Sequence, residues 1–154
     1  MAVLEQRNFA QIGFLVHDIE ESKKQFARLF GVEEPETVSS GEYEVTKTVY
    51  LGKPAPDAEC KMAFFHLTEG VQLELIEPGT APSAWRDYLD QHGEGMHHIA
   101  FHVNGMEKCI EKCKEKGMTL LQSGEYNDAS GRYAYLDGLN KYKCVMELLE
   151  SCHP

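Results

Sequence analysis

The sequence predicts an α+β protein in which two βαβββ repeats form one curved, eight-stranded sheet around a central trough. The chain has 154 residues, of which 42% are hydrophobic and 26% charged, and this suffices for one ordinary core. Similar segments occur in the same order in both halves, each with the same succession of strand and helix patterns. We therefore expect residues 1–154 to form a single domain, with repeats at 9–78 and 96–151 joined by a linking segment at 79–95.

The internal repeat can be read directly from two pairs of segments. Residues 11–20 read QIGFLVHDIE and residues 98–107 read HIAFHVNGME, so apolar and acidic positions recur at the same spacing. Residues 71–78, VQLELIEP, correspond in the same way to residues 144–151, CVMELLES. Self-similarity of this kind indicates one supersecondary unit that is used twice.

Each repeat begins with a strand that is followed by a helix. Alternating apolar residues predict the first strand at residues 9–16. Asp18, with Glu21 three residues later, is typical of a helix start, and Gly31 marks the end of that helix. In the second repeat we expect the corresponding strand at 96–103 and the helix at 106–116.

Three further strands complete each repeat. Short alternating or β-branched runs between glycines and prolines indicate them. In the first repeat we expect strands at 43–50, 61–66 and 71–76, and in the second at 119–122, 132–135 and 145–149. The linking segment is expected to contain a short helix at residues 83–91.

The composition disfavours several classes of function. The 25 acidic residues exceed the 15 Lys and Arg residues, and a formal net charge of −10 disfavours nucleic-acid binding. No apolar stretch approaches the length of a membrane span, and the first residues lack the pattern of a signal peptide. The five cysteines form no CxxC pair, and Cys109 and Cys113 fit one buried helix face. These features favour a cytoplasmic protein that binds neither membranes nor nucleic acids.

Corresponding polar residues of the two repeats are expected to face the trough. The period of two in strands places Gln11 and His98 on the trough face of the two first strands, and Glu74 and Glu147 on that of the two last strands. Two buried carboxylates are costly unless a cation or a proton neutralises them. With an imidazole and an amide, they form a donor set that suits one divalent ion per chain, such as Co, Ni, Zn or Mn. Alternatively, the histidine is a core residue and the carboxylates face solvent.

The sequence resembles the vicinal oxygen chelate superfamily in four stretches, IGFLVHDIEESKKQFARLFG, VQLELIEP, GEGMHHIAFHV and CVMELLE. This superfamily includes glyoxalase I, methylmalonyl-CoA epimerases, extradiol dioxygenases and bleomycin-resistance proteins. The resemblance implies that Gln11, Glu74, His98 and Glu147 are the metal ligands. GEGMHHIAF and the chain length are most similar to the epimerases, which carry His at the position of Gln11. The Gln, Glu, His, Glu set instead resembles that of some glyoxalase I enzymes, and residues 127–132 lack the AHG element of epimerases.

The resemblance also implies a reaction, in which a carboxylate removes a proton from carbon next to a carbonyl and a metal stabilises the resulting enediolate. Glu147 and Glu74 are the expected catalytic residues, with Glu147 as the base. A second base could come from Asp57 or Glu59, although both also fit a polar loop.

A methylmalonyl-CoA epimerase-like enzyme is the leading hypothesis for the function. The alternatives are a glyoxalase I-like lactoylglutathione lyase, a metal-free binding protein of the bleomycin-resistance type, and a metal-containing member with other chemistry. The substrate would accordingly be a small molecule, either an acyl-CoA or a thiol adduct. We expect a homodimer, as in most of the superfamily. Trp85 could contribute to the dimer contact or fill the core. For the binding-protein alternative, Trp85, Tyr88 and the net charge of −10 are compatible with an aromatic or a cationic ligand.

Overall fold

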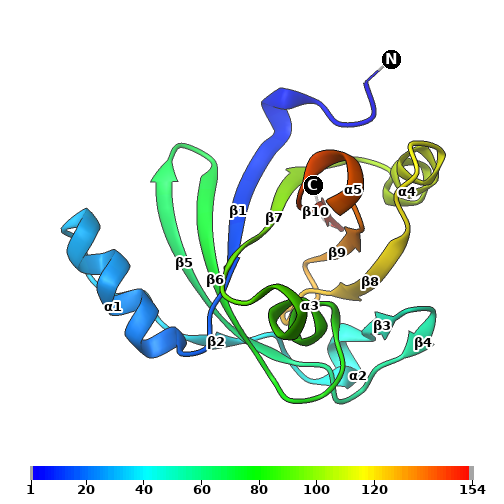
Figure 1. Ribbon diagram of the computed structural model, residues 1–154. Coiled ribbons are helices and arrows are strands. Elements are labelled where there is room, and N and C mark those ends of the chain that lie inside the picture. The colour runs from blue at the N-terminus through cyan, green and yellow to red at the C-terminus, as the bar shows by residue number, and fades with distance from the viewer. Residues whose placement is uncertain (1, 153–154) are drawn as a thin grey trace.

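The computed structural model describes residues 2–152, so Met1 and residues 153–154 of the expected domain lie outside the described residues. Its strands form one ten-stranded sheet that curves around the centre of the molecule, with helices outside it (Figure 1). The α+β class and the curved sheet agree with the sequence-based prediction. The expected number of eight strands was too low.

The first half of the chain supplies the elements up to the linking segment. They are η1 (Gln6–Asn8), β1 (Phe9–Leu15), α1 (Ile19–Phe30), β2 (Val38–Ser39), α2 (Tyr43–Thr46), β3 (Val49–Tyr50), β4 (Lys53–Pro54), β5 (Cys60–Thr68) and β6 (Val71–Pro78). The helix expected between residues 18 and 31 is confirmed. The Asp18 side chain accepts a hydrogen bond from the Glu21 backbone N–H, and Gly31 ends the helix in a left-handed conformation.

The second half begins with the linking helix and repeats the same succession. Its elements are α3 (Ala84–His92), β7 (Gly95–His102), α4 (Met106–Glu115), β8 (Leu120–Glu125), β9 (Gly131–Leu136), α5 (Leu139–Tyr142) and β10 (Val145–Ser151). The expected linking helix and the expected strands of this half are confirmed within a few residues. Short α5, between β9 and β10, was not expected.

The strand order relates the two halves to each other. The sheet runs β2-β5-β6-β1-β7-β10-β9-β8-β3-β4, so the first and last strands of each repeat, β1 with β6 and β7 with β10, lie at its centre. Both of these pairs are parallel, whereas β1 and β7 are antiparallel to each other. The centre of the sheet is therefore built from matching strands of the two repeats.

The strand expected at residues 43–50 was wrong, and the difference explains the additional strands. The segment starts with α2, and Lys47 then takes a positive φ of 49°, which interrupts any extended run. Thr46 and Thr48 are both buried and their hydroxyls are 2.9 Å apart, so tertiary contacts override the alternating pattern. The second strand of this repeat is the two-residue β2, which pairs with β5, whereas the β3–β4 hairpin extends the other half beside β8.

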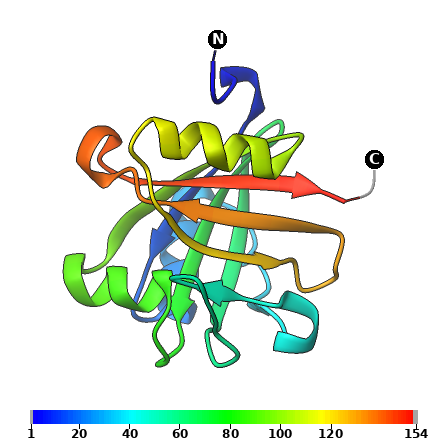
Figure 2. The same ribbon diagram turned by 90° about the vertical axis from the view of Figure 1, so that its right-hand side faces the viewer.

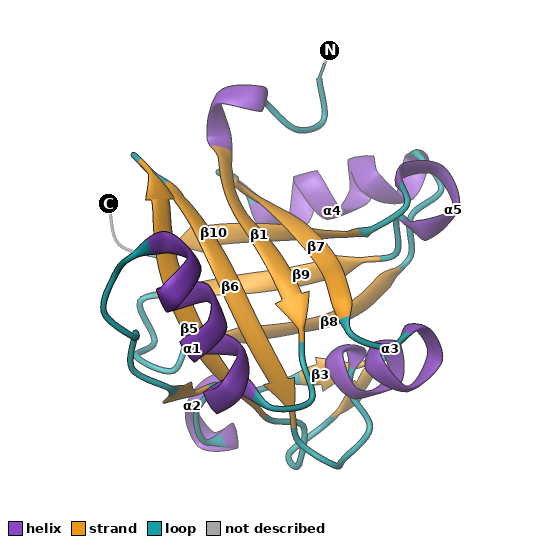
Figure 3. Cartoon of the chain, turned by 60° about the vertical axis from the view of Figure 1, so that its left-hand side comes forward, coloured by secondary structure: helices purple, strands orange, loops and turns teal. Residues whose placement is uncertain are grey.

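Helices α1 and α4 cover the outer face of the sheet (Figure 1). Helix α1 packs on β5 and β6 (Figure 3), and α4 lies across β9 and β10 (Figure 2). Helix α3 packs instead against the inner side of the sheet, through an apolar cluster that contains Trp85, Leu15 and Tyr135. Trp85 is 3% exposed, so it fills the core rather than offering a surface contact. Among residues 2–152, no helix has the length and apolar character that a membrane span requires.

Candidate metal centre

The central strands bring corresponding residues of the two repeats to one place. On β1 and β7, Gly13 lies opposite His98, and Gln11 lies opposite Ala100. These pairs are related by the repeat, in which Gln11 corresponds to His98 and Gly13 to Ala100. The antiparallel pairing therefore brings the side chains of Gln11 and His98 next to each other at the centre of the sheet.

The last strand of each repeat adds one carboxylate. Glu74 on β6 lies beside Gly13, and Glu147 on β10 lies beside Ala100, the matching position. Glu74 and Glu147 are 5% and 4% exposed, and His98 is fully buried. The strand register thus brings one amide, one imidazole and two carboxylates into the interior, as the sequence pattern predicted.

These side chains lie close enough together to share one ion. His98 Nε2 is 2.9 Å from Gln11 Oε1, 2.9 Å from Glu147 Oε2 and 3.5 Å from Glu74 Oε1. Ligand atoms of Glu74, His98 and Glu147 all lie within 4.8 Å of one another. The three residues could therefore hold a metal ion, with the Gln11 amide oxygen as a fourth donor.

The electrostatics of the site call for a cation or protons. Burial raises the pKa of Glu74, and the nearby Glu147 raises it further. Burial also raises the pKa of Glu147 to about 8, against a smaller opposing effect of a hydrogen bond from Tyr135. Burial lowers the pKa of His98 to about 3, which disfavours an imidazolium as the neutralising charge.

The hydrogen bonds of the site are incomplete, and this provides a test of metal fit. Glu74 Oε1 and Glu147 Oε2 are buried and have no hydrogen-bond partner among residues 2–152. A neutral imidazole has at most one proton on Nε2, and Gln11 Oε1 competes for it at 2.9 Å. Oxygen and nitrogen donors that converge without enough protons to satisfy them fit a divalent cation.

Gly13 makes room for the histidine. A Cβ atom at this position would lie 2.0 Å from His98 Cε1, closer than any real contact. The sequence pattern placed Gly13 on the trough face but gave it no role. A glycine in a strand interior can indicate such a close approach, although only the β1–β7 register identifies what approaches it.

A cavity of about 520 Å³ opens beside the centre and corresponds to the expected trough. Gln11, Glu74 and Glu147 line it, and none of its described lining residues is Lys or Arg. The remaining wall is rich in aromatic rings, which come from Phe64, Trp85, Tyr126, Tyr133 and Tyr135. The cavity therefore combines aromatic walls with polar groups, which besides the metal-centre residues include Glu125, Asn127 and Asp128.

Not every expected residue lies at this centre. Asp57 and Glu59 do not line the cavity, and Glu59 instead lies against Gly79. Tyr88 contacts the His97 ring but does not line the cavity. The helix cysteines Cys109 and Cys113 belong to a separate core cluster under α4. None of these five residues belongs to the candidate metal centre or lines its cavity.

Comparisons with known proteins agree with this architecture. The model of a family described as the Glyoxalase/Bleomycin resistance protein/Dioxygenase superfamily matches residues 10–135. An uncharacterized protein of Bacillus subtilis (strain 168), YqjC, is 30% identical over 95 residues, which are 61% of this chain and 67% of that protein.

Several solved structures share the fold. A methylmalonyl-CoA epimerase from Mycobacterium tuberculosis has a TM-score of 0.66 and 15% identity, over 99% of this chain and 93% of that chain. A variant of the Streptomyces coelicolor methylmalonyl-CoA epimerase, in complex with 2-nitronate-propionyl-CoA, has a TM-score of 0.64 and 21% identity, over 97% and 96%. A hypothetical protein from Bacillus halodurans C-125 has a TM-score of 0.63 and 22% identity, over 95% of each chain. At these identities the likeness concerns the fold.

Proposed function

The chain belongs to the glyoxalase/bleomycin resistance protein/dioxygenase superfamily, and from this premise we propose that it is a metal-dependent enzyme that removes a proton from carbon next to a carbonyl group. The observation that carries the proposal is the buried pair of carboxylates, Glu74 and Glu147, each with an oxygen that has no hydrogen-bond partner among residues 2–152. Both lie within reach of one neutral imidazole, that of His98.

Four residues would hold the metal, namely Gln11, Glu74, His98 and Glu147. Their donors are three oxygens and one nitrogen, a set that suits Co, Ni, Zn or Mn, with one ion per chain. When bound, such an ion supplies Lewis acidity that stabilises the negative charge of an enediolate. The cavity beside the four side chains provides space for the substrate.

Glu147 is our candidate for the proton-transferring residue. Its carboxylate lines the cavity and lies beside the other donors, so it can accept a proton from a substrate carbon. Glu74 also lines the cavity and comes from the corresponding strand of the other repeat, so a second carboxylate faces the substrate. Returned to the opposite face of the same carbon, the proton completes an epimerisation; returned to the neighbouring carbon, it completes an isomerisation.

The first substrate to test is an acyl-CoA. The variant of the Streptomyces coelicolor epimerase that shares this fold was solved with 2-nitronate-propionyl-CoA, and another structure of a methylmalonyl-CoA epimerase contains methylmalonyl-CoA. A second candidate is the glyoxalase I-like reaction on a thiol adduct, lactoylglutathione lyase chemistry. Gln11 favours it, because the donor set Gln, Glu, His, Glu resembles that of some glyoxalase I enzymes.

Deuterium exchange tests the proposal without prior choice between the two reactions. Metal-loaded protein is incubated in deuterated water with methylmalonyl-CoA or with a methylglyoxal–thiol adduct, and mass spectrometry follows deuterium at the carbon next to the carbonyl. General base catalysis contributes about 10²- to 10⁴-fold, so Glu147→Gln should slow the exchange by that range. The control is Glu150→Gln, on the same strand, where the side chain binds Arg132 instead.

The outcomes of this assay separate the hypotheses. Exchange that persists unchanged in Glu147→Gln would remove this residue from the base role and direct attention to Glu74. Wild-type protein that binds metal and exchanges neither substrate would contradict the proposed function. It would favour the alternative of a metal-containing superfamily member with other chemistry.

A further inference from the structure

The His98 ring is in contact with the ring of the preceding residue, His97, on its Nδ1 side. His97 Nδ1 lies 2.9 Å from His98 Nδ1, on the side of the ring away from Nε2 and the carboxylates. The His97 side chain is fully buried, and its Nε2 has no hydrogen-bond partner among the described residues. No step of the proposed reaction uses this second histidine.

A β-bulge in β7 allows the two imidazole rings to contact each other. Successive side chains of a regular strand point to opposite faces, so neighbouring rings should not meet. Gly13 pairs with His98, but the next residue of β1, Phe14, pairs with Met96. His97 is therefore the extra residue of β7, and bulges of this kind redirect side chains next to functional sites.

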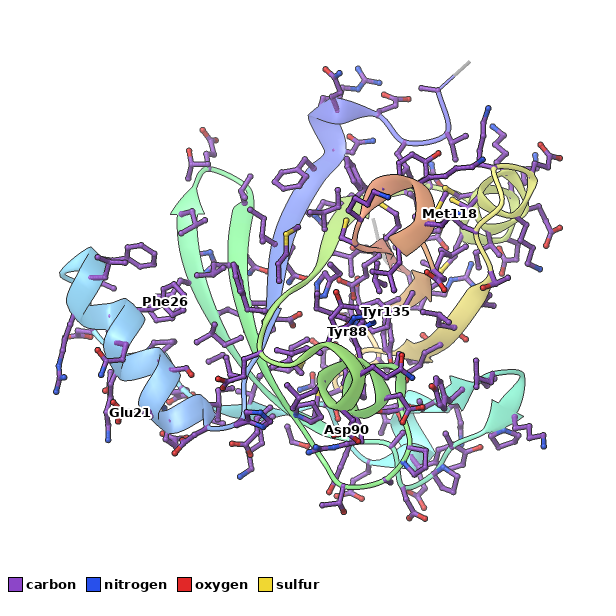
Figure 4. All side chains as sticks on the ribbon, viewed as in Figure 1. Glu21, Phe26, Tyr88, Asp90, Met118 and Tyr135 are labelled. Atoms are coloured by element: carbon purple, nitrogen blue, oxygen red, sulfur yellow. The ribbon has the colours of Figure 1, made fainter. Side chains whose placement is uncertain are left out.

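Aromatic rings on two sides hold His97 in place. The Tyr88 ring lies edge-on with a centroid distance of 4.7 Å, and the Tyr135 ring lies edge-on at 5.3 Å. Tyr88 on α3 and Tyr135 on β9 both lie near the middle of the molecule (Figure 4). The Tyr88 hydroxyl also donates a hydrogen bond to the Met96 carbonyl, 3.3 Å away, at the start of the bulge. The position of the His97 ring is thus set by packing.

The contact has a consequence for the protons of His98. At 2.9 Å one of the two Nδ1 atoms must donate and the other accept. A neutral imidazole has a single N–H, so His98 offers a lone pair at Nε2 only when its proton is on Nδ1. His97 Nδ1 must then be the acceptor. A proton on both Nδ1 atoms would bring two N–H groups into opposition.

We propose that His97 is a positioning residue for the metal centre, whose Nδ1 accepts the Nδ1–H of His98 and so keeps the Nε2 lone pair of His98 directed at Gln11, Glu74 and Glu147. The proposal rests on the metal binding within the proposed function, and not on any particular substrate. Histidines that bind metals usually donate their other N–H to such a partner, and loss of the partner typically weakens metal affinity about 10- to 100-fold.

Two nearly isosteric variants isolate the acceptor. In His97→Asn the side-chain oxygen stands at the same bond distance from the backbone as Nδ1, whereas His97→Leu has a similar shape and no acceptor. We expect His97→Leu to bind Zn²⁺ or Co²⁺ about 10- to 100-fold more weakly than the wild type, and His97→Asn to restore most of the affinity. Thermal unfolding of the metal-free variants controls for packing, since both lose the same ring contacts with Tyr88 and Tyr135.

A spectroscopic measurement on the wild type needs no variant. In the zinc-loaded protein, the ¹⁵N shifts of the two imidazoles should show a metal-bound Nε2 and a protonated Nδ1 for His98, and a protonated Nε2 for His97. Equal zinc affinities of folded His97→Leu and His97→Asn, or a His98 bound to zinc through Nδ1, would overturn the proposal. So would a wild type that binds no divalent ion. The zinc titrations and the ¹⁵N measurement use no substrate. Absence of turnover in the deuterium-exchange assay would therefore reject the proposed reaction and leave the positioning role of His97 standing.

Discussion

Gly13→Ala should remove His98 from the metal centre by adding a single methyl group. The new Cβ would lie 2.0 Å from His98 Cε1, 2.4 Å from Nδ1 and 2.5 Å from Nε2. The ring would have to retreat by about 1 Å to reach the 3.0 Å below which real contacts are essentially never found. The His98 ring also lies 2.9 Å from His97, Nδ1 to Nδ1, so any shift of the ring must also accommodate this contact.

The magnitude follows from this geometry. Overpacking of a buried site typically costs about 1–3 kcal/mol, so the metal-free variant should lose stability in that range. Functional constellations tolerate displacements of only about 0.5 Å, which a shift of about 1 Å exceeds. We therefore expect metal affinity to fall by at least the roughly 10- to 100-fold typical of losing a supporting partner.

A double-mutant cycle assigns the loss to the histidine. Urea unfolding and zinc titration are measured for Gly13→Ala, His98→Ala and the double variant. In the His98→Ala background the new methyl meets no ring, so its cost in unfolding free energy should largely disappear, with a coupling of about 1–3 kcal/mol. If Gly13→Ala costs the same with and without the imidazole, or binds zinc as tightly as the wild type, the close approach of Gly13 to His98 is wrong.

Two further predictions concern the same centre. Gln11→His should preserve the fold and keep or strengthen metal binding measured by calorimetry, because an imidazole nitrogen replaces a neutral amide oxygen; if thermal stability and metal content both collapse, Gln11 is a packing residue. Burial raises the pKa of Glu74 in the folded protein and raises that of Glu147 from 4.5 to about 8. Between pH 4.5 and about 8 the folded, metal-free protein therefore binds more protons than the unfolded chain. This pair should therefore lower stability as pH rises from about 4.5 to about 8, and added zinc should stabilise the protein most near the upper end; thermal melts with equal zinc stabilisation at both ends would contradict this.

The repeat made most of the fold predictable. Strands with long alternating patterns, such as β1, β6 and β7, were placed within a few residues, because one of their faces must be buried. The two-residue strand β2 carries no periodic pattern of its own and exists through its pairing with β5. The β3–β4 hairpin crosses to the other half, and such long-range pairing leaves no local signal.

The candidate site was predictable where it follows strand periodicity. Gln11, Glu74, His98 and Glu147 converge because a period of two and the repeat put them on one face. The role of His97 could not be foreseen, because the same period places it on the opposite face and only the bulge in β7 redirects it. Bulges arise from pairing between strands, and a single strand sequence does not indicate them.

The most direct test of the metal centre is a titration of chelator-stripped protein with Zn²⁺ or Co²⁺. We predict saturation at one ion per chain for the wild type and for Cys109→Ala, whose side chain lies in the separate core cluster under α4. His98→Ala should lose most of the binding, because it removes the nitrogen donor between Gln11 and the two carboxylates. A wild type that binds no ion, or a folded His98→Ala protein that binds one ion with undiminished affinity, would contradict the account.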